Sequence, residues 1–390
     1  MEGTSIFEGL VKPQCSVNCK YEEFIFMPAF VHLLNYLTLR VSVEGHTQTT
    51  GILLVNIGER GRALKSASCD LAFDYMFHAG LGRKFSKRLT PTDMQGRSLI
   101  VTAGSPEGFL GKMATLDCAH GILYYDELSK LVSKASIESS SLVPDLCTML
   151  ESGEFGSITL RNSPVLSAGE YCVSAIMNVP RKHFRKVWGQ LENEQTGLND
   201  RAFFLLEPQK VKVITPRVDV SFAQGIYKTR ELVDAAVERG VIGAGDWTLF
   251  NTSIERLGNR AEVRAEIFAM GFAVELGRAV VDDDCKRRGI ALAEYDVASK
   301  LYLHTIESEN KEGALQQEMV LYVAEAGDKV EYRKFCQDLN YMRYGTTIWE
   351  RAFFGLTNGE QPQLRFVKGT RGSKGTPAMV YLIPENCMLD

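Results

Sequence analysis

Residues near the start of the chain have the types and the order that phosphate binding requires. Between the apolar stretch ILLVNI and a segment with helical spacing lie Gly58, Gly61, Lys65 and Ser66. Glycines let backbone amides point at anionic oxygens, a lysine reaches the outer phosphates, and a serine hydroxyl binds Mg²⁺. A strand, a loop and a helix in this order are also the context in which such a loop functions. We therefore predict a nucleotide phosphate loop.

The loop departs at one position from the usual spacing GxxxxGK[ST]. Leu64 stands where a glycine normally precedes the lysine, and Gly61 lies three residues further back. An ordinary strand-to-helix turn with an exposed lysine is the alternative interpretation. The residues predicted to bind ATP are Gly58, Glu59, Arg60, Gly61, Arg62, Ala63, Leu64, Lys65 and Ser66.

Two acidic residues, Asp126 and Glu127, follow a second apolar stretch, ILYY. At the end of a strand, one carboxylate can hold Mg²⁺ while the other orients the attacking water. We predict that Asp126 and Ser66 bind Mg²⁺ and that Glu127 activates the water. The alternative is an ordinary helix N-terminus, where acidic residues interact favourably with the helix dipole.

Two later residues are further catalytic candidates. Asn178 follows the apolar stretch CVSAIM, where it would sense the γ phosphate or position water. Arg201 in TGLNDRAFF would stabilise transition-state charge, as an arginine from a neighbouring subunit does in ring-forming ATPases. That role requires a homo-oligomeric ring. A local salt bridge between Asp200 and Arg201 is the alternative.

A basic segment near the C-terminus predicts contact with DNA. No acidic residue lies between Gln361 and Pro377, and glycines separate the basic side chains. Such charge suits contacts with backbone phosphates, although a solvated hairpin loop has the same composition. The predicted DNA-binding residues are Arg365, Lys368, Arg371 and Lys374.

Length and composition limit the class of protein. At 390 residues the chain is long enough for two or three domains, and its net charge of -4 gives no general attraction to nucleic acid. Cys15 and Cys19 lack a second pair at zinc-ligand spacing. The scattered cysteines, without a CxxC pair or an export signal, indicate a cytoplasmic protein. The run FIFMPAFVHLLNYL is too short and too interrupted to cross a bilayer, so we expect no membrane partner.

The order of elements predicts an α/β protein. We expect a helix from about Pro28 to Leu39, a hairpin around RVSVEGHTQTTG and a strand over residues 52–57. Strands alternate with helices over residues 50–210, which indicates a mostly parallel sheet with helices on both faces. Together with the phosphate loop, this predicts a RecA/AAA-like P-loop NTPase fold.

Four parts are predicted along the chain. A loose N-terminal arm (1–24) precedes the P-loop ATPase core (25–225), and helical spacing dominates the next region (226–310). The last part (311–390) shows helix, turn, helix and two strands, which is the order of a winged helix.

Several segments together resemble a broad family of bacterial and phage proteins of unknown function that carry a helicase-like P-loop ATPase core. Members of the family often occur with primase-type modules on mobile elements, although no primase or zinc module is evident in this chain. The resemblance covers about residues 25–383 and rests on NYLTLRVSV, NIGERGRALKS, VTAGSPEG, LYYDELSKL, TGLNDRAFFLLEP and RYGTTIWERAFFGL. It implies ATP hydrolysis coupled to DNA replication or remodelling, with Lys65 and Ser66 binding phosphate and magnesium, and Asp126 and Glu127 serving magnesium and water.

We therefore expect an ATP-dependent DNA helicase or translocase that acts in replication or mobile-element maintenance, as a ring on single-stranded or forked DNA. One alternative is a nucleotide-binding DNA adaptor or replication initiator with weak or no hydrolysis. A second alternative is an anti-phage or regulatory switch ATPase.

Overall fold

The computed structural model divides the chain into two compact units, Met1–Ser299 and Lys300–Asp390, which are described separately below. All residues of the chain are described except 19–20, 45–50, 61–62, 103–105, 136–141, 152–170, 193–196, 208–222, 256, 258, 304–310, 340–345, 360–361, 370–375 and 384–390.

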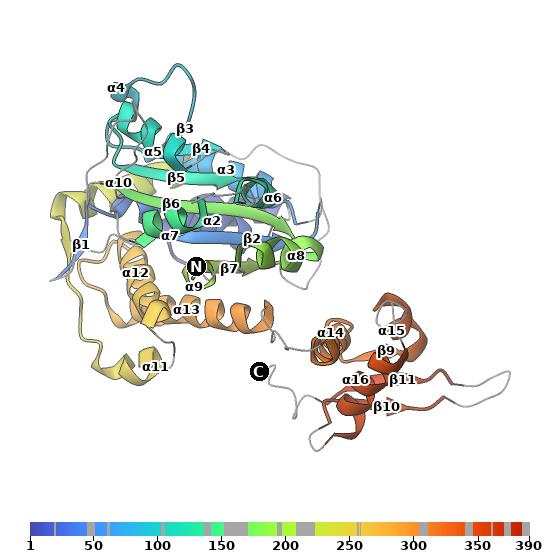
Figure 1. Ribbon diagram of the computed structural model, residues 1–390. Coiled ribbons are helices and arrows are strands. Elements are labelled where there is room, and N and C mark those ends of the chain that lie inside the picture. The colour runs from blue at the N-terminus through green and yellow to red at the C-terminus, as the bar shows by residue number, and fades with distance from the viewer. Residues whose placement is uncertain are drawn as a thin grey trace. The chain divides into compact units, whose positions relative to one another are not determined.

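The first unit is built on a six-stranded sheet in which all strands are parallel, which confirms the predicted α/β class (Figure 1). The strands lie in the order β3-β4-β5-β6-β2-β7. Their inner members are mostly apolar because helices cover both faces, although β2 and β6 also carry the buried polar residues Asn56 and Asn178. The strands are β2 (Leu53–Gly58), β3 (Gly82–Lys84), β4 (Ser98–Thr102), β5 (His120–Tyr125), β6 (Cys172–Pro180) and β7 (Ala202–Leu206).

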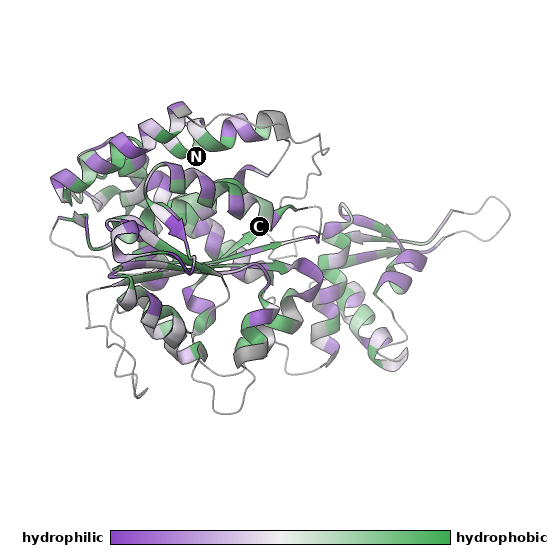
Figure 2. Cartoon of the chain, turned by 90° about the horizontal axis from the view of Figure 1, so that it is seen from above, coloured by the Kyte–Doolittle hydropathy of each residue, from purple (hydrophilic) through white to green (hydrophobic). Residues whose placement is uncertain are grey.

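Helices lie on both sides of this sheet, as Figure 2 shows with the sheet edge-on. α2 and α3 pack on each other, and α2 contacts the four inner strands. Among the other helices, α5 contacts β5, while α7 and α8 contact β6. The helices are α2 (Glu22–Leu37), α3 (Lys65–His78), α5 (Pro106–Thr115), α6 (Ser129–Ala135), α7 (Leu142–Glu151), α8 (Arg181–Glu192) and α9 (Leu198–Arg201).

The central helix α2 begins at Glu22, six residues before the predicted start at Pro28. Proline inside a helix removes one backbone hydrogen bond, which normally ends or bends the helix. Here Phe24, Ile25 and Phe26 are fully buried in the core, and Phe26 stacks on Phe30 at 5.2 Å between ring centroids. Burial of each large apolar side chain contributes about 1.5–3 kcal/mol, so the extra turns offset the lost bond.

The prediction of a loose N-terminal arm is wrong for the described residues 1–18. A π-helix, η1 (Phe7–Val11), leads into α1 (Lys12–Asn18), and Ile6, Leu10 and Val11 belong to the main core. Gly9 of η1 crosses Gly225 of α10 (Ala223–Arg239) so closely that a Cβ on Gly9 would lie 2.4 Å from the Gly225 Cα. The two glycines permit this approach.

The predicted hairpin around residues 40–51 is not formed by the part of that segment that the structure describes. Instead β1 (Ser42–Val43) pairs in parallel with β8 (Val241–Ile242), almost 200 residues later. Pairing over such a separation leaves no local sequence signal.

The helices after residue 223 pack within the first unit. α10 contacts η1 and α3, and α12 contacts α2. α13 protects the edge strand β7, because the backbone N–H of Phe204 donates to Asp296 and that of Leu206 donates to the Tyr295 hydroxyl, at 3.4 and 2.9 Å. Asp296 also forms a buried ion pair with Arg264 at 2.7 Å. The remaining elements are η2 (Thr248–Phe250), α11 (Asn251–Glu255), α12 (Asn259–Glu275) and α13 (Asp283–Leu303).

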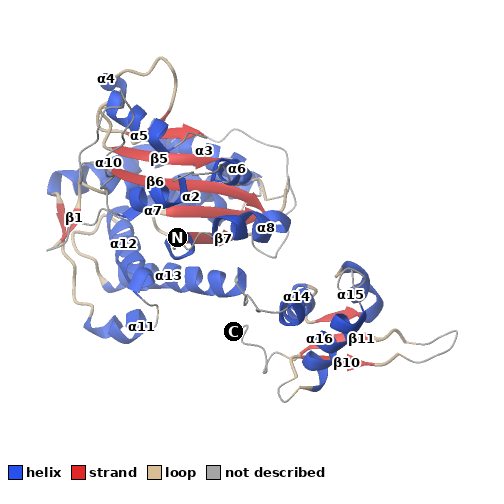
Figure 3. Cartoon of the chain, viewed as in Figure 1, coloured by secondary structure: helices blue, strands red, loops and turns tan. Residues whose placement is uncertain are grey.

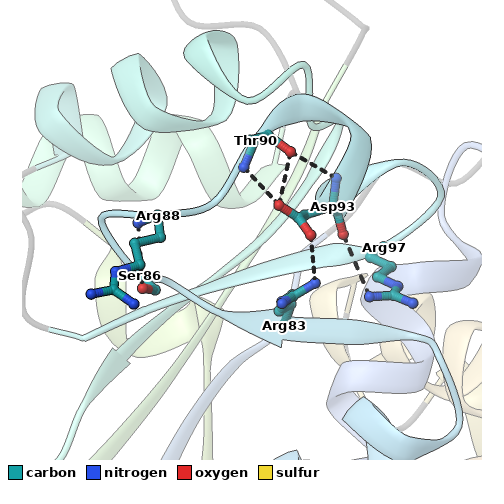
Figure 4. A network of polar contacts seen from close by, with 6 residues as sticks. All are labelled: Arg83, Ser86, Arg88, Thr90, Asp93 and Arg97. Atoms are coloured by element: carbon teal, nitrogen blue, oxygen red, sulfur yellow. Dashed lines mark hydrogen bonds and ion pairs between the residues drawn. The ribbon is translucent and has the colours of Figure 1, made fainter.

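At the other edge of the sheet lies β3, which begins at Gly82 and runs into a basic stretch of the chain. Its three residues, GRK, show no apolar alternation. The following turn is fixed by a capping box at the start of α4 (Pro91–Met94): Thr90 Oγ1 accepts the N–H of Asp93, and the Asp93 carboxylate accepts the N–H of Thr90 (Figure 4). Arg83 forms an ion pair with the same carboxylate at 3.0 Å.

In its described residues, the second unit combines the helices α14, α15 and α16 with a three-stranded antiparallel sheet of order β10-β11-β9 (Figure 3). Its core contains Trp349, Phe335 and Leu364, with Phe353 packed against them. Its elements are α14 (Lys311–Glu325), β9 (Lys329–Glu331), α15 (Tyr332–Asp338), α16 (Thr346–Asn358), β10 (Leu364–Val367) and β11 (Met379–Leu382). In neither unit do the described residues include a helix with the length and apolar character needed to cross a bilayer.

A buried carboxyl joins the N-terminal segment to α12. The Glu275 carboxylate accepts the backbone N–H of Ile6 at 2.7 Å and the Ser5 hydroxyl at 2.9 Å. Ser5 in turn shares a 2.8 Å hydrogen bond with Thr229. Burial raises the pKa of Glu275 from 4.5 to about 7, against the opposing effect of these hydrogen bonds.

This raised pKa predicts a pH-dependent stability. The folded state favours the protonated carboxyl, so its contribution is fully present below pH 4.5 and is lost as the pH rises through about 7. We expect Glu275→Gln to remove a decline of roughly 3 kcal/mol or less over this range, measured by urea unfolding at several pH values. Glu238→Gln, on an exposed face of α10, is the control and should keep the slope. An identical slope in Glu275→Gln would contradict the assignment.

Candidate functional site

The site lies at the edge of the sheet where the parallel strands end. β2 lies between β6 and β7, and the chain leaves β2 for the far edge strand β3 before it returns through β4, β5 and β6. In open parallel sheets, ligands bind in the crevice beyond the carboxyl ends of the strands where the connections change direction. Here that position is the end of β2.

A cavity of about 350 Å³ occupies this position. It brings together residues of the predicted phosphate loop, the acidic pair and Asn178, and Glu59 and Asn178 are 119 positions apart in the sequence. Gly61 and Arg62 of the predicted loop lie outside the described residues. The cavity is lined by Glu59, Arg60, Leu64, Lys65, Ser66, Ala67, Asp126, Glu127, Asn178, Val179 and Pro180.

Lys65 is the first residue of α3, and its side chain is buried at the end of β2. Its ammonium donates to the carbonyl oxygen of Gly58 at 2.6 Å and to that of Glu59 at 3.4 Å. Burial lowers the pKa of Lys65, while the carboxylates of Glu207 and Glu59 act in the opposite direction. The alternative of an exposed lysine is therefore wrong.

Leu64, which replaces the usual glycine, has left-handed backbone angles of φ 50° and ψ 27°. An L-residue in this conformation costs about 1–2 kcal/mol, because its Cβ approaches the neighbouring carbonyl oxygen. The backbone therefore has the conformation that glycine adopts freely, although the residue is leucine. Leu64 turns the chain so that α3 begins at Lys65 beside the cavity.

A network of side-chain hydrogen bonds fixes Ser66 at the wall of the cavity. The Asn178 amide nitrogen donates to the Ser66 hydroxyl at 3.4 Å and to the Tyr124 hydroxyl at 3.2 Å. The Asn178 amide oxygen accepts from Asn56 at 2.9 Å. Cys69 lies beneath this network, and burial raises the pKa of its thiol to about 12, which keeps it protonated. Asn178 thus connects β6, β2 and α3 at the wall of the cavity.

The acidic pair lies on the turn after β5. The backbone N–H of Leu128 donates to the carbonyl oxygen of Asn178 at 2.8 Å, which attaches this turn to β6. Asp126 pairs with Lys130 one turn later, and both acidic side chains are exposed at the cavity. Ser66 and Asp126 offer hydroxyl and carboxylate oxygens, the donors that Mg²⁺ prefers. These residues fit a magnesium site.

Arg201 lies away from the cavity of its own chain. It ends α9 and precedes β7, whose first residue, Ala202, pairs with Leu53 at the start of β2. Five residues of strand separate Leu53 from Gly58, which corresponds to about 17 Å. The guanidinium of Arg201 donates to the carbonyl oxygen of Gly197 at 2.9 Å. Arg201 therefore does not line the cavity of its own chain.

Of the predicted DNA-binding residues, Arg365 and Lys368 are exposed on and just after β10. Arg371 and Lys374 lie outside the described residues. A groove of about 710 Å³ runs beside the two described cations, and its lining includes Phe354 and Asn358 of α16. Phe354 is exposed.

Sequence analysis missed the partners that fix the site. Asn56 within β2, Tyr124 within β5 and Glu207 after β7 all contact residues of the cavity or its loop. Asn56 and Tyr124 lie within apolar stretches, and no sequence pattern around them indicates a functional residue. Glu207, by contrast, directly follows the strand AFFLL, as Asp126 follows ILYY, and this position could have identified it.

A comparison with models of known protein families finds no match, and a comparison with curated proteins finds none either.

The conformation of Leu64 predicts an unusual ranking of variants. Glycine destabilises a helix interior relative to alanine, but at the N-cap position of Leu64 it relieves the left-handed strain. We expect Leu64→Gly to be more stable than Leu64→Ala by about 1 kcal/mol, measured by urea unfolding. At Ala67, inside α3 on the same cavity wall, the order should be the opposite, with Ala67→Gly less stable than the wild-type alanine. Equal stability of the two Leu64 variants would contradict the strained conformation.

Proposed function

We propose that the first unit is a P-loop NTPase core that binds and hydrolyses ATP. The observation that carries this proposal is the convergence of Lys65, Ser66 and Asn178 with Asp126 and Glu127 on one cavity at the carboxyl edge of a parallel sheet. Each residue has the chemistry that phosphoryl transfer to water requires. The residues come from α3, from β6 and from the turn after β5, which are far apart in the sequence.

Lys65 supplies the positive charge for the outer phosphates. Its ammonium now contacts the carbonyl oxygens of Gly58 and Glu59, and a phosphate oxygen entering the loop would replace them as acceptor. The loop amides and the start of α3 favour the same anion, because the first N–H groups of a helix have no partners within it.

Ser66 and Asp126 would hold Mg²⁺, which when bound neutralises charge on the β and γ phosphates. Glu127, adjacent to Asp126, accepts a proton from the attacking water or orients it. Asn178 keeps Ser66 in place and lines the cavity, and from there its amide would sense the γ phosphate.

We further propose that ATP turnover acts on DNA, as a helicase or translocase does. The element order of the second unit, α14, β9, α15, α16, β10 and β11, fits a winged helix. Arg365 and Lys368 provide cations for phosphates, and the exposed Phe354 in the adjacent groove offers a surface for base stacking.

The position of Arg201 favours an oligomer. Because it lies about 17 Å along the sheet from the loop, a role in stabilising transition-state charge requires a neighbouring copy of the chain. A homo-oligomeric ring provides such a neighbour at every cavity.

The second candidate is a nucleotide-binding DNA adaptor or initiator that does not turn ATP over. Leu64 favours it, since a strained loop without the usual glycine is less free to close on phosphates. Bound ATP that persists without hydrolysis, with and without single-stranded DNA, would support the adaptor.

Hydrolysis is tested by two substitutions in the cavity. Lys65→Ala should abolish ATP binding, and Glu127→Gln should retain binding but reduce turnover on the order of 100-fold or more. ATPase rate and nucleotide affinity are measured with and without single-stranded DNA. Lys112→Ala and Glu238→Gln, outside the cavity, are matched controls. If both cavity variants hydrolyse ATP at the wild-type rate, the assignment is wrong.

DNA binding is tested in the second unit. Arg365→Ala combined with Lys368→Ala should weaken binding of single-stranded DNA and reduce the salt slope by about 0.7 for each lost phosphate contact. The control is Lys329→Ala combined with Arg333→Ala, which removes the same number of positive charges from exposed positions that do not line the groove. An unaltered salt slope in the first double variant, or the same loss in both, would refute the predicted surface.

A further inference from the structure

A buried carboxylate touches the phosphate loop from the side of β7. Glu207 directly follows β7 and is only 7% exposed. Its Oε2 accepts the backbone N–H of Glu59 at 2.5 Å, and its Oε1 accepts the hydroxyl of Tyr21 at 3.0 Å. The backbone N–H of Glu207 donates to the carbonyl oxygen of Ile57 at 2.8 Å. Both the side chain and the backbone of this residue therefore fix the end of β2.

Packing at Gly58 shows how close this contact is. A Cβ on Gly58 would lie 3.1 Å from the Cβ of Glu207 and 2.7 Å from that of Ala63. The first turn of the loop is thus held between Glu207 on one side and the residue before Leu64 on the other. A side chain at Gly58 would push Glu207 away from the Glu59 amide.

Tyr21 orients the carboxylate from the opposite side. It is the residue before α2, is buried, and packs edge-on against Phe24 at 5.8 Å between ring centroids. Its hydroxyl occupies one carboxylate oxygen and leaves the other for Glu59. Through Glu207, the start of the central helix is joined to the loop.

Glu207 also acts on charge. Its carboxylate opposes the effect of burial on the pKa of Lys65 and so favours the protonated lysine that a phosphate needs. The same negative charge repels a bound triphosphate. Loop geometry and nucleotide affinity therefore depend on different properties of one side chain, its hydrogen bonds and its charge.

We propose that Glu207 is the positioning residue of the phosphate loop, with Tyr21 as its support. The proposal rests on the nucleotide site proposed above. Glu207 holds the N–H of Glu59 at the start of the loop, keeps Lys65 charged, and limits the affinity for the anionic ligand.

Hydrogen exchange at the Glu59 amide, measured without nucleotide, tests whether Glu207 holds this amide in place. We expect protection in the wild type and in Glu207→Gln, which keeps an acceptor oxygen, but roughly tenfold or faster exchange in Glu207→Ala. Tyr21→Phe should give an intermediate rate. Unchanged protection in Glu207→Ala would overturn the proposal, whether or not the protein binds ATP.

Measurements of nucleotide binding test the effect of the Glu207 charge on Lys65 and on the affinity for ATP. At neutral pH, Glu207→Gln should bind ATP roughly tenfold more tightly than the wild type, and Glu207→Ala should bind more weakly because the loop is loosened. The alkaline limb of the binding profile should also move to lower pH in Glu207→Gln, since Lys65 loses a neighbouring carboxylate. A residue that only maintained the fold would not shift this limb.

Two controls complete the experiment. Glu238→Gln, on the exposed face of α10, should match the wild type in all measurements, and thermal melting of each variant reports whether the fold is intact. If Glu207→Gln and the wild type have the same affinity and pH profile, the electrostatic role is refuted. If no variant, including the wild type, binds ATP while Glu59 behaves as expected, the nucleotide proposal fails and the loop contact stands.

Discussion

The common direction of the six strands is the constraint on which the site depends. Because every strand ends at the same edge, the turn after β2 and the turn after β5 open toward one cavity, with β6 between them. Side-chain hydrogen bonds then connect these elements: Asn56 of β2 donates to Asn178 of β6, and Asn178 donates to Ser66 of α3. A reversal of any one of these strands would move its polar residue to the far edge.

The same constraint explains how much of the site the sequence predicts. Lys65, Ser66 and Asp126 each follow a short apolar stretch, and once the sheet is taken as parallel, residues in that position must meet. The predicted α/β class is confirmed for the same reason. Arg201 precedes its strand instead, and its position at the opposite edge follows from the same rule.

Other features arise from contacts between distant segments, and local patterns do not predict them. β1 pairs with β8 across almost 200 residues, and Tyr21 meets Glu207 across 186. The burial of α2 explains another difference, since tertiary packing of Phe24 and Phe26 extends the helix through a proline that would otherwise end it. Leu64 shows the reverse case, in which the backbone has a conformation typical of glycine although the residue is leucine.

The crossing of Gly9 and Gly225 has a consequence for genetics. Neither glycine lies in the cavity lining, yet an added methyl group at either position must separate η1 from α10, because backbone atoms fill the space. Alanine there would weaken the attachment of the N-terminal helices while leaving every cavity side chain in place. These two positions are therefore suited to temperature-sensitive alleles, with which a cell could be depleted of the working protein by warming alone.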